Sequence, residues 1–560
     1  MVTMTGARYL AETLEAYGVS HVFFVPTILS LALAEMEQRT QIQRVVTHGE
    51  KAAVYMADGY ARALGRPGVC MAQTAGAANL VAGLRDPYLA STPLIALTGG
   101  PTPESRGRHM YQEIDDLPLF KSVTKASRLV DRVDRLPDAL RQAFRDATTG
   151  TPGPVHIEIQ GHQGQLEQDE ADLDPVVDER FAHCPPFRPE PDAASVAEAA
   201  RLLEGADRPV LIIGGGARTS GADLEVLELA ERLAIPFATS LNGKSVVPGD
   251  HPLNVGVVGN YSRESANRTV LAAGLVFFVG SRTGSQATAS WQVPRPGTRV
   301  IQLDINPNEL GRHYPNQVEI AGDAKVSVQH LLAVADSSSA DRRGEWVQCA
   351  QGFVAEWRDR YHSLITSEAT PIRPERICGE LTGHLPPDAI LVADTGHAGM
   401  WTGGMVDLIH SGQDYLRAAG SLGWGLPAAI GAKMAQPDRP VLLFTGDGGL
   451  YYHLAELETA ARWGVNVVIL VNDNGSLNQE IHPYSESYGG QLHGRHEELW
   501  HFRAIDLAAV AESLGVTGIR VERPGDLRPA LERAFSADGP VLLDVVTDIE
   551  ALAPLALTSP

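Results

Sequence analysis

Residues 441–474 read VLLFTGDGGLYYHLAELETAARWGVNVVILVNDN, and this stretch decides the fold of the last third of the chain. An apolar run at Val441–Phe444 predicts a buried strand, and a second run at Val467–Val471 predicts another. Apolar residues at helical spacing between them predict an amphipathic helix: Leu454, Leu457, Ala460 and Ala461. Such a strand, helix and strand form a right-handed βαβ unit, in which the two strand ends are neighbours.

Each of the two predicted strands ends in residues that carry oxygen ligands. Asp447 follows the first strand within Gly446-Asp447-Gly448-Gly449, and Asn474 closes the second within Asn472-Asp473-Asn474. Carboxylate and amide oxygens suit Mg²⁺ or Ca²⁺. Glycines let backbone N–H groups approach a diphosphate, and the helix that follows presents its positive end to it. We therefore expect a metal-bridged diphosphate here; the plainer alternative is a βαβ turn with a capping aspartate.

Composition excludes several classes of function. The chain has 560 residues, enough for three domains of ordinary size. With 46 basic and 68 acidic residues the net charge is −22, which argues against nucleic acid as a partner. No apolar run is long enough to span a membrane, and the N-terminus lacks the pattern of a signal peptide. Four scattered cysteines without a CxxC pair predict a cytoplasmic protein with neither disulfides nor a zinc site: Cys70, Cys184, Cys349 and Cys378.

Strand and helix patterns alternate in three blocks, which predicts an α/β protein with three doubly wound parallel-sheet domains. The expected domains are residues 1–165, 193–335 and 371–548. The acidic, proline-bearing segment 164–192 predicts a surface linker. The run SSSADRRGEW at 337–346 predicts a polar connection between the second and third domains.

The spacing from Gly446-Asp447-Gly448 to the strand end at Asn474 resembles the motif of enzymes that use thiamin diphosphate, also called thiamine pyrophosphate. The three predicted domains resemble those of the acetolactate synthase-like decarboxylases and carboligases along essentially the whole chain. The resemblance implies a pyrimidine-binding, a central and a diphosphate-binding domain, in that order. It also implies that Asp447, Asn474 and the backbone carbonyl of Ser476 hold Mg²⁺, with the glycine run beside the diphosphate.

In this family a glutamate protonates N1′ of the cofactor's pyrimidine ring, and the resemblance places that role at Glu50. Residues Val45–Ala53 read VVTHGEKAA: a strand, a turn and the start of a helix close to the family's version. A dry setting would bring the proton affinity of Glu50 close to that of the pyrimidine. The alternative is a carboxylate that stabilises a helix N-terminus. In the family this glutamate faces the diphosphate site of a second subunit, which implies a homodimer or a homotetramer.

Two further segments resemble cofactor contacts. In AAGSLGWGLP (418–427), the resemblance makes Leu422 the bulky wedge that bends the cofactor into a V. The resemblance also implies that the carbonyl of Gly420 accepts a hydrogen bond from the cofactor's amino group. His397 falls where relatives bind a diphosphate oxygen. The alternative for Leu422 is a core leucine before a glycine-rich helix start. The alternative for His397 is a surface histidine whose hydrogen bonds are already satisfied.

Four residues are expected on the substrate side. Thr27 lies in a first-domain loop that faces the thiazolium in relatives, and Gln112 matches a glutamine that would hydrogen-bond the adduct, unless it only caps its loop. Glu480 lies six residues after Asn474, where simple 2-oxo-acid decarboxylases carry a proton-relaying glutamate and acetolactate synthases an apolar residue. His482 could share that role. The alternative is an exposed carboxylate on a mobile loop.

The central domain carries only part of a dinucleotide fingerprint. Gly214-Gly215-Gly216 follows an apolar run, but the third glycine of GxGxxG is missing. Acetolactate synthases bind FAD in this domain with the help of an acidic pair, whereas residues 280–286 read GSRTGSQ. FAD is therefore doubtful, and a purely structural central domain is expected.

The resemblance implies an enzyme for small-molecule substrates that decarboxylates a 2-oxo acid such as pyruvate and transfers the acyl carbanion to a second carbonyl. Gln112 favours ligation, whereas Glu480 favours proton transfer. The alternatives are a thiamin diphosphate-dependent lyase or acyltransferase and a simple 2-oxo-acid decarboxylase. A flavin or nicotinamide oxidoreductase and a non-catalytic assembly subunit are more remote. The missing GxGxxG counts against the oxidoreductase, and the intact Glu50, Asp447 and Asn474 count against the assembly subunit.

Overall fold

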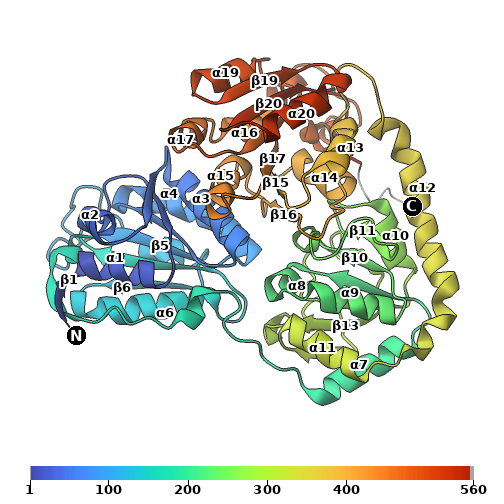
Figure 1. The fold of residues 1–560 in the computed structure, drawn as a ribbon, viewed down its shortest axis with the longest axis horizontal. Helices are drawn as coiled ribbons and strands as arrows, with labels where there is room; N and C mark the ends of the chain where they lie inside the picture. The colour runs from blue at the N-terminus through green and yellow to red at the C-terminus, as the bar shows by residue number, and fades with distance from the viewer. Residues whose placement is uncertain (1, 555–560) are drawn as a thin grey trace.

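The structure is a computed structural model that describes residues 2–554. Figure 1 shows three α/β bodies, formed in turn by the N-terminal, middle and C-terminal parts of the chain. Each contains a six-stranded, wholly parallel sheet flanked by helices. The fold class expected from the sequence is confirmed, and each sheet falls inside one of the three predicted domains. The exact domain boundaries stay predictions.

The first sheet and the helices that flank it are formed by the N-terminal part of the chain. Its strands are, in spatial order, β3 (Gln43–Val46), β2 (His21–Phe24), β4 (Gly68–Ala72), β5 (Leu94–Gly100), β7 (Pro154–Gln160) and β6 (Ala126–Val130). Its helices are α1 (Gly6–Ala16), α2 (Ser30–Arg39), α3 (Glu50–Leu64), α4 (Ala77–Ala90), α5 (Leu117–Phe120) and α6 (Leu136–Thr148).

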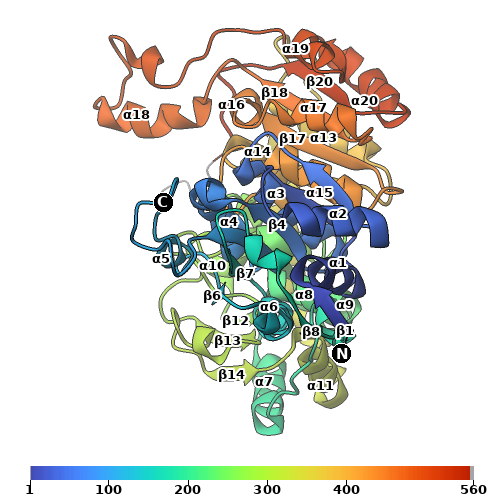
Figure 2. The ribbon, with the colours of Figure 1, turned by 90° about the vertical axis from the view of Figure 1, so that its left-hand side faces the viewer.

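The third sheet repeats the strand order of the first. Its strands are, in spatial order, β16 (Asp414–Arg417), β15 (Ile390–Ala393), β17 (Val441–Gly446), β18 (Val468–Asp473), β20 (Val541–Val546) and β19 (Thr517–Val521). Its helices are α13 (Pro374–His384), α14 (His397–Met405), α15 (Gly425–Ala435), α16 (Asp447–Tyr451), α17 (Glu456–Arg462), α18 (Ile481–Ser487), α19 (Leu507–Ser513) and α20 (Leu527–Phe535). Figure 2 shows α18 projecting away from the rest of the third domain.

The central sheet has a different order, in which the strand numbering reverses once at the middle of the sheet, as in dinucleotide-binding folds. Its strands are, in spatial order, β11 (Asn254–Val257), β10 (Phe237–Thr239), β9 (Pro209–Ile213), β12 (Leu275–Val279), β13 (Arg299–Asp304) and β14 (Val318–Ala321). Its helices are α7 (Ala193–Gly205), α8 (Gly215–Ser220), α9 (Asp223–Arg232), α10 (Glu264–Ala272) and α11 (Ala324–Val334).

The strands are apolar because both faces of each sheet are covered, as parallel sheets require. Every residue of β12, LVFFV, is buried. One hydrophobic cluster runs from the first sheet through α3 and α15 to the third sheet, and it includes Phe23, Met56, Ile430 and Leu443. The first and third domains of one chain therefore share a core.

Two connecting segments are more ordered than their composition predicts. Within the expected surface linker 164–192, β8 (Glu170–Leu173) pairs antiparallel with β1 (Val2–Thr5), so this part of the linker forms regular structure and remains largely exposed. Within SSSADRRGEW, Arg343 is buried and its guanidinium donates to the carbonyls of Ala206, Leu203 and Leu233. The run then enters α12 (Gly344–Ile365), the long helix at the edge of Figure 1. Local composition does not predict the order of these two segments, because their polar groups form hydrogen bonds with partners far away in the sequence.

None of the helices within residues 2–554 has both the length and the apolar character needed to cross a bilayer. All four cysteines are free thiols.

Candidate active site

The acid and the amide predicted at the two strand ends stand at one edge of the third sheet. β17 and β18 pair in parallel, with Gly446 opposite Asn472. Asp447 directly follows β17, and Asn474 directly follows β18. The strand order reverses between β15 and β17, and ligands bind outside the carboxyl ends of strands at such a reversal.

Asp447 is buried, and its Oδ2 has no hydrogen-bond partner among residues 2–554. The pKa of Asp447 is raised to about 7, first by burial and then by the nearby carboxylate of Asp473. A divalent cation would satisfy the free oxygen and offset the repulsion between the two carboxylates. The residues therefore fit the metal that the sequence predicts. The described residues hold no cluster of three or more His, Cys, Asp or Glu side chains that could bind a metal ion.

The glycines around Asp447 differ in what constrains them. A Cβ atom at Gly448 would lie 2.5 Å from Leu477 Cδ2, and one at Gly449 would lie 2.7 Å from Thr445 Oγ1. A Cβ atom at Gly446 would meet nothing closer than the Asn472 carbonyl oxygen at 3.9 Å. Packing thus explains Gly448 and Gly449, while Gly446 leaves room for a ligand to approach the backbone.

The single helix predicted between β17 and β18 is wrong in detail. The segment forms the short α16, which begins at Asp447, and then α17, separated by a turn at Tyr452–Ala455. A diphosphate at this place therefore does not meet the macrodipole of a long helix. It can instead be bound by the backbone N–H groups of the Gly446–Gly449 turn.

Asn474 and Ser476 lie next to each other on the loop after β18. The hydroxyl of Ser476 donates to Asn474 Oδ1 over 2.9 Å, and Ser476 is buried. The N–H of Phe502 donates to the Gly475 carbonyl over 2.7 Å, which fixes the loop from the other side. The predicted metal ligands are therefore held in place before any ligand binds.

Two carboxylates anchor the loop that contains Gly420 and Leu422. Asp394, which directly follows β15, accepts from the N–H groups of Gly423 and Gly425, each over 3.1 Å. Burial raises the pKa of Asp394 to about 6. On the other side of Leu422, Asp86 of α4 accepts from the N–H of Ser421 over 3.1 Å. Leu422 itself is half-buried, so it is not the fully packed core leucine of the alternative interpretation.

His397 begins α14 and is held through both ring nitrogens. Nδ1 lies 2.8 Å from Asn478 Oδ1, and Nε2 accepts from the N–H of Ala553 over 3.4 Å. Asn478 donates its own amide hydrogens to the carbonyls of Ile549 and Ala551, so His397 must donate through Nδ1. Burial lowers the pKa of His397 to about 4. The neutral ring ties α14 to the C-terminal segment. With its proton on Nδ1, the ring offers Nε2 as an acceptor and cannot donate from there to a diphosphate oxygen.

Glu480 and His482 lie at the start of α18, close to His397. Asn478 bonds His397 and stands two residues before Glu480, and the charge of His482 lowers the pKa of His397. Glu480 is half-buried and accepts no hydrogen bond through its carboxylate from the described residues, while His482 is exposed. The role of Glu480 and the alternative of an exposed carboxylate on a mobile loop both stay predictions.

Glu50, Thr27 and Gln112 belong to the first domain. Glu50 is the first residue of α3, and Oε2 accepts from the Asn79 amide over 3.0 Å. Thr27 is exposed and lies 3.5 Å from Gln73 through their side-chain oxygens. Gln112 adopts a φ of 64°, and its Oε1 is buried without a partner in the described chain.

The structure does not join the two groups of predicted residues within one chain. Across residues 2–554, no hydrogen bond or ion pair connects Glu50, Thr27 or Gln112 with Asp447 or Asn474. Glu50 stands at the start of α3 in the first domain, and Asp447 stands at the start of α16 in the third. We call these two places the half-sites.

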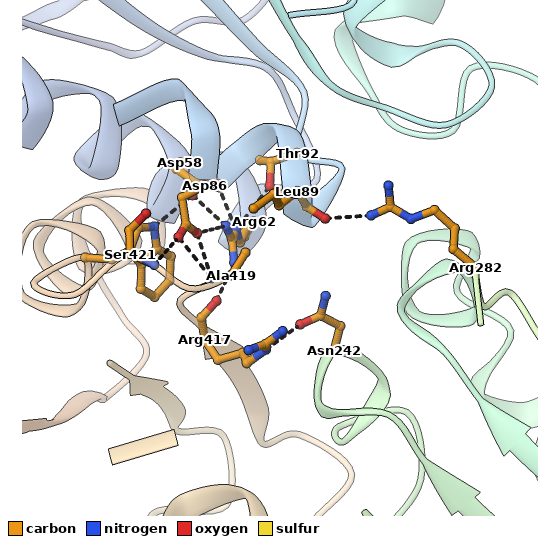
Figure 3. Close-up of polar contacts among 11 residues, drawn as sticks. Asp58, Arg62, Asp86, Leu89, Thr92, Asn242, Arg282, Arg417, Ala419 and Ser421 are labelled. Atoms are coloured by element: carbon orange, nitrogen blue, oxygen red, sulfur yellow. Dashed lines mark hydrogen bonds and ion pairs between the residues drawn. The ribbon is translucent and has the colours of Figure 1, made fainter. Parts of the chain in front are cut away.

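A cavity of about 1070 Å³ opens where all three domains meet, at the upper end of the size range of small-molecule sites. Its wall includes Gly216, Gly280 and Asp304 at the carboxyl ends of central strands. It extends to Gly420 of the third domain. Figure 3 shows Arg282 and Asn242 of the central domain reaching across to Leu89 and Arg417 of the other two. The central domain thus forms part of a cavity wall, and the expectation of a purely structural central domain stays a prediction.

Sequence reasoning gave no role to three buried aspartates near the site. Asp394 supports the loop of Leu422, and Asp86 supports the same loop from the first domain. Asp544 lies beside Asp473, and the pKa of Asp473 is raised to about 6, first by burial and then by Asp544. Each interrupts an otherwise apolar run: ILVADTG, LVAGLRDPYLA and VLLDVV. A charged residue inside a predicted buried element was the available signal.

Comparison with known proteins gives a consistent result over the whole chain. Three family models match: the N-terminal TPP-binding domain of thiamine pyrophosphate enzymes at residues 4–119, their central domain at 196–331 and their C-terminal TPP-binding domain at 394–545. The chain is 32% identical to a probable acetolactate synthase large subunit of Methanocaldococcus jannaschii, over 99% of this chain and 93% of that one. It is 31% identical to the acetolactate synthase isozyme 1 large subunit of Escherichia coli K12, over 98% and 94%. It is 31% identical to an acetolactate synthase of Arthrospira platensis, over 99% and 96%.

Proposed function

The chain belongs to the acetolactate synthase-like thiamine pyrophosphate enzymes, and on that premise we propose that it decarboxylates pyruvate and joins the remaining acyl group to the carbonyl of a second 2-oxo acid. The protein is thus a thiamin diphosphate-dependent enzyme that breaks and forms carbon–carbon bonds. The observation that carries the proposal is the buried, unpartnered carboxylate oxygen of Asp447, at the sheet edge next to Asn474.

Asp447, Asn474 and the Ser476 carbonyl would hold Mg²⁺, and the open backbone at Gly446 would receive the diphosphate. The unpartnered Oδ2 of Asp447 and the absence of a side chain at Gly446 support this assignment. When bound, thiamin diphosphate supplies a carbon nucleophile whose ring accepts the electron pair released as carbon dioxide leaves. The chain's own residues bind the cofactor, bend it and handle protons.

Glu50 would hold a proton at N1′ of the pyrimidine, and in the proposed assembly it does so for a second copy of the chain. Large apolar side chains are exposed on both half-sites: Leu31, Tyr111 and Ile114 in the first domain, and Tyr452, Phe502 and Ile505 in the third. A homodimer or a pair of such dimers would cover them. We keep a cytoplasmic location as part of the proposal.

Gln112 and Glu480 would decide the fate of the substrate carbon. The buried, unpartnered Oε1 of Gln112 is free to accept a hydrogen bond from a substrate hydroxyl, which would orient the acyl donor for ligation. The half-buried carboxylate of Glu480 would hold a proton near the same atom, with exposed Thr27 and His482 at the substrate entrance. Ligation requires that proton transfer from Glu480 be slower than attack on the second carbonyl.

Product analysis with isotopically labelled pyruvate tests the proposal. We expect release of labelled carbon dioxide and a labelled acetohydroxy acid. Acetaldehyde as the sole organic product would support the simple decarboxylase instead, and Glu480→Gln should then lower its formation. Absence of carbon dioxide with every 2-oxo acid tried would favour the lyase or acyltransferase alternative.

FAD is not part of the proposed cycle. The residues at 280–286 lack the acidic pair of FAD-binding relatives, although the cavity beside them has room for a nucleotide. Nothing in the chemistry of decarboxylation and ligation transfers electrons to a second redox centre.

A further inference from the structure

Three buried charged side chains of the first domain hold the third-domain loop that contains Gly420 and Leu422. Figure 3 shows Asp58, Arg62 and Asp86 grouped beside Arg417, Ala419 and Ser421. Asp58 and Arg62 lie on α3 and Asp86 lies on α4; both carboxylates are fully buried. None of these residues contacts the predicted metal ligands.

Asp86 is the centre of the contact. Its carboxylate accepts from the N–H of Ala419 over 2.8 and 3.0 Å and from the N–H of Ser421 over 3.1 Å. Arg62 donates to the same carboxylate over 3.0 Å. Ala419 stands 333 residues away along the chain, so these bonds cross from one domain to another.

Arg62 orients Asp86 and adds a further bond to the loop. Its Nε and Nη2 donate to the two oxygens of Asp58 over 2.7 and 2.6 Å, and Nη1 donates to the Arg417 carbonyl over 2.6 Å. The indole N–H of Trp424 donates to Asp58 over 2.8 Å. The loop is therefore held at its beginning, middle and end.

Charge explains why the loop is drawn to this place. Two buried carboxylates share the guanidinium of Arg62 in direct ion pairs, and the charge of Arg417 interacts with Asp86 without a direct ion pair. A buried anion requires hydrogen-bond donors, and the backbone N–H groups of Ala419 and Ser421 supply them. The position of the loop backbone is thereby set by a fixed charge in another domain.

The two residues assigned to the cofactor lie between these anchors. Gly420, with a φ of 132°, stands between the two N–H groups that Asp86 accepts. Leu422 stands between Ser421, held by Asp86, and Gly423, held by Asp394. A shift at Asp86 would move the Gly420 carbonyl and the Leu422 side chain together.

We propose that Asp86, oriented by Arg62, is a positioning residue that sets Gly420 and Leu422 for the bent conformation of the cofactor. Asp86 can have this role only if the chain binds thiamin diphosphate, so the role rests on the function proposed above. The diphosphate anchor at Asp447 and Asn474 is separate. Loss of Asp86 should therefore slow activation of the cofactor while the cofactor still binds.

The test compares Asp86→Asn with the wild-type holoenzyme in the presence of Mg²⁺. An asparagine offers one acceptor oxygen where the carboxylate offers two, so Ala419, Ser421 and Arg62 cannot all be satisfied. We expect the Kd of thiamin diphosphate to stay within about threefold. The rate of hydrogen–deuterium exchange at C2 of the bound cofactor, and kcat with pyruvate, should fall about 10- to 100-fold, as for an ångström-scale misplacement. The KM for pyruvate should change little.

Glu375→Gln is the matched control. Glu375 is a buried carboxylate that pairs with Arg373 over 2.7 Å and does not touch the loop. In Glu375→Gln, the rate of hydrogen–deuterium exchange at C2 of the bound cofactor should stay at the wild-type value. Asp86→Glu should recover part of the rate lost in Asp86→Asn, because the charge returns.

Trp424→Phe serves as a second variant if Asp86→Asn fails to fold. It replaces the buried indole by a smaller aromatic ring and removes the hydrogen bond to Asp58. We expect a smaller fall in the exchange rate at unchanged cofactor affinity. Unchanged exchange in the folded variants overturns the positioning role, as does a loss of exchange that only parallels a loss of cofactor affinity. A wild-type protein that binds no thiamin diphosphate overturns the proposed function and this role together; an active wild type with unaffected variants overturns the role alone.

Discussion

A side chain at Gly59 would overlap the carbonyl oxygen of Ala428, because α3 of the first domain and α15 of the third cross with their backbones in contact. A side chain at Gly431 would overlap the Met56 carbonyl in the same way. The crossing lies in the middle of the hydrophobic cluster that the two domains share. The relative position of the first and third domains in one chain thus depends on two glycines.

Gly59→Ala should lower stability by about 1–3 kcal/mol, or more, because the helices must separate to admit the methyl group. The shift in the thermal unfolding midpoint measures this. Gly352→Ala is the control: a Cβ there meets nothing within 4 Å, inside α12. It should be neutral or stabilising by up to about 1 kcal/mol. Equal effects of the two substitutions would contradict the close crossing.

Glu50→Gln should lower kcat by about 10²- to 10⁴-fold, because an amide cannot hold a proton at N1′ of the pyrimidine. Steady-state kinetics with pyruvate measure the loss, and calorimetry should still detect cofactor binding. The exposed Glu190→Gln, remote from the site in sequence, controls for loss of one negative charge. Full turnover by Glu50→Gln would show that the activating role is wrong.

Asp447→Asn should weaken Mg²⁺ binding in the presence of thiamin diphosphate by about tenfold or more, since a charged ligand is lost. Titration of EDTA-treated protein with Mg²⁺ measures the change through recovery of activity and through calorimetry. Asp438→Asn, at an exposed turn, should behave as wild type. Equal Mg²⁺ affinities in the two variants would remove Asp447 from the ligand set.

Acid should destabilise the protein through histidines whose pKa is lowered by burial, and half-buried His397 and His453 are two of them. Burial lowers the pKa of both His397 and His453 to about 4, from an ordinary value of 6.5. Between these values the unfolded chain binds more protons, so the contribution of each neutral ring, complete above about pH 6.5, is lost as the pH falls towards about 4.

His453→Asn should reduce this dependence. His453 donates through Nδ1 to the Gly423 carbonyl over 2.7 Å, and asparagine can also donate there without titrating. Unfolding midpoints measured across the window give the slope for wild type and variant. His362→Asn, at an exposed histidine, controls for the substitution itself. A slope as steep in His453→Asn as in wild type would exclude His453 as a source.

The purified protein should show no flavin absorption in the visible range, because residues 280–286 lack the acidic pair of FAD-binding relatives. Absorption spectra before and after denaturation test this. A flavin band that survives dialysis would assign the three-domain cavity to FAD and reverse the expectation.

The sequence by itself determined the strands, the fold class and the neighbouring positions of Asp447 and Asn474. Apolar runs bounded by glycine identify buried parallel strands, and the fixed hand of a βαβ unit places consecutive strand ends at one edge. Both signals lie within a few tens of residues, so a single stretch such as 441–474 contains everything that they require.

The tertiary structure alone decided which distant groups meet. Asp86 and Ala419, β1 and β8, and the buried Arg343 with its carbonyl partners are joined across long separations in the chain. A buried charge takes its donors from whichever backbone the packing of α3 against α15 brings within reach. That choice depends on the summed energy of contacts between domains, which no local pattern of residues contains.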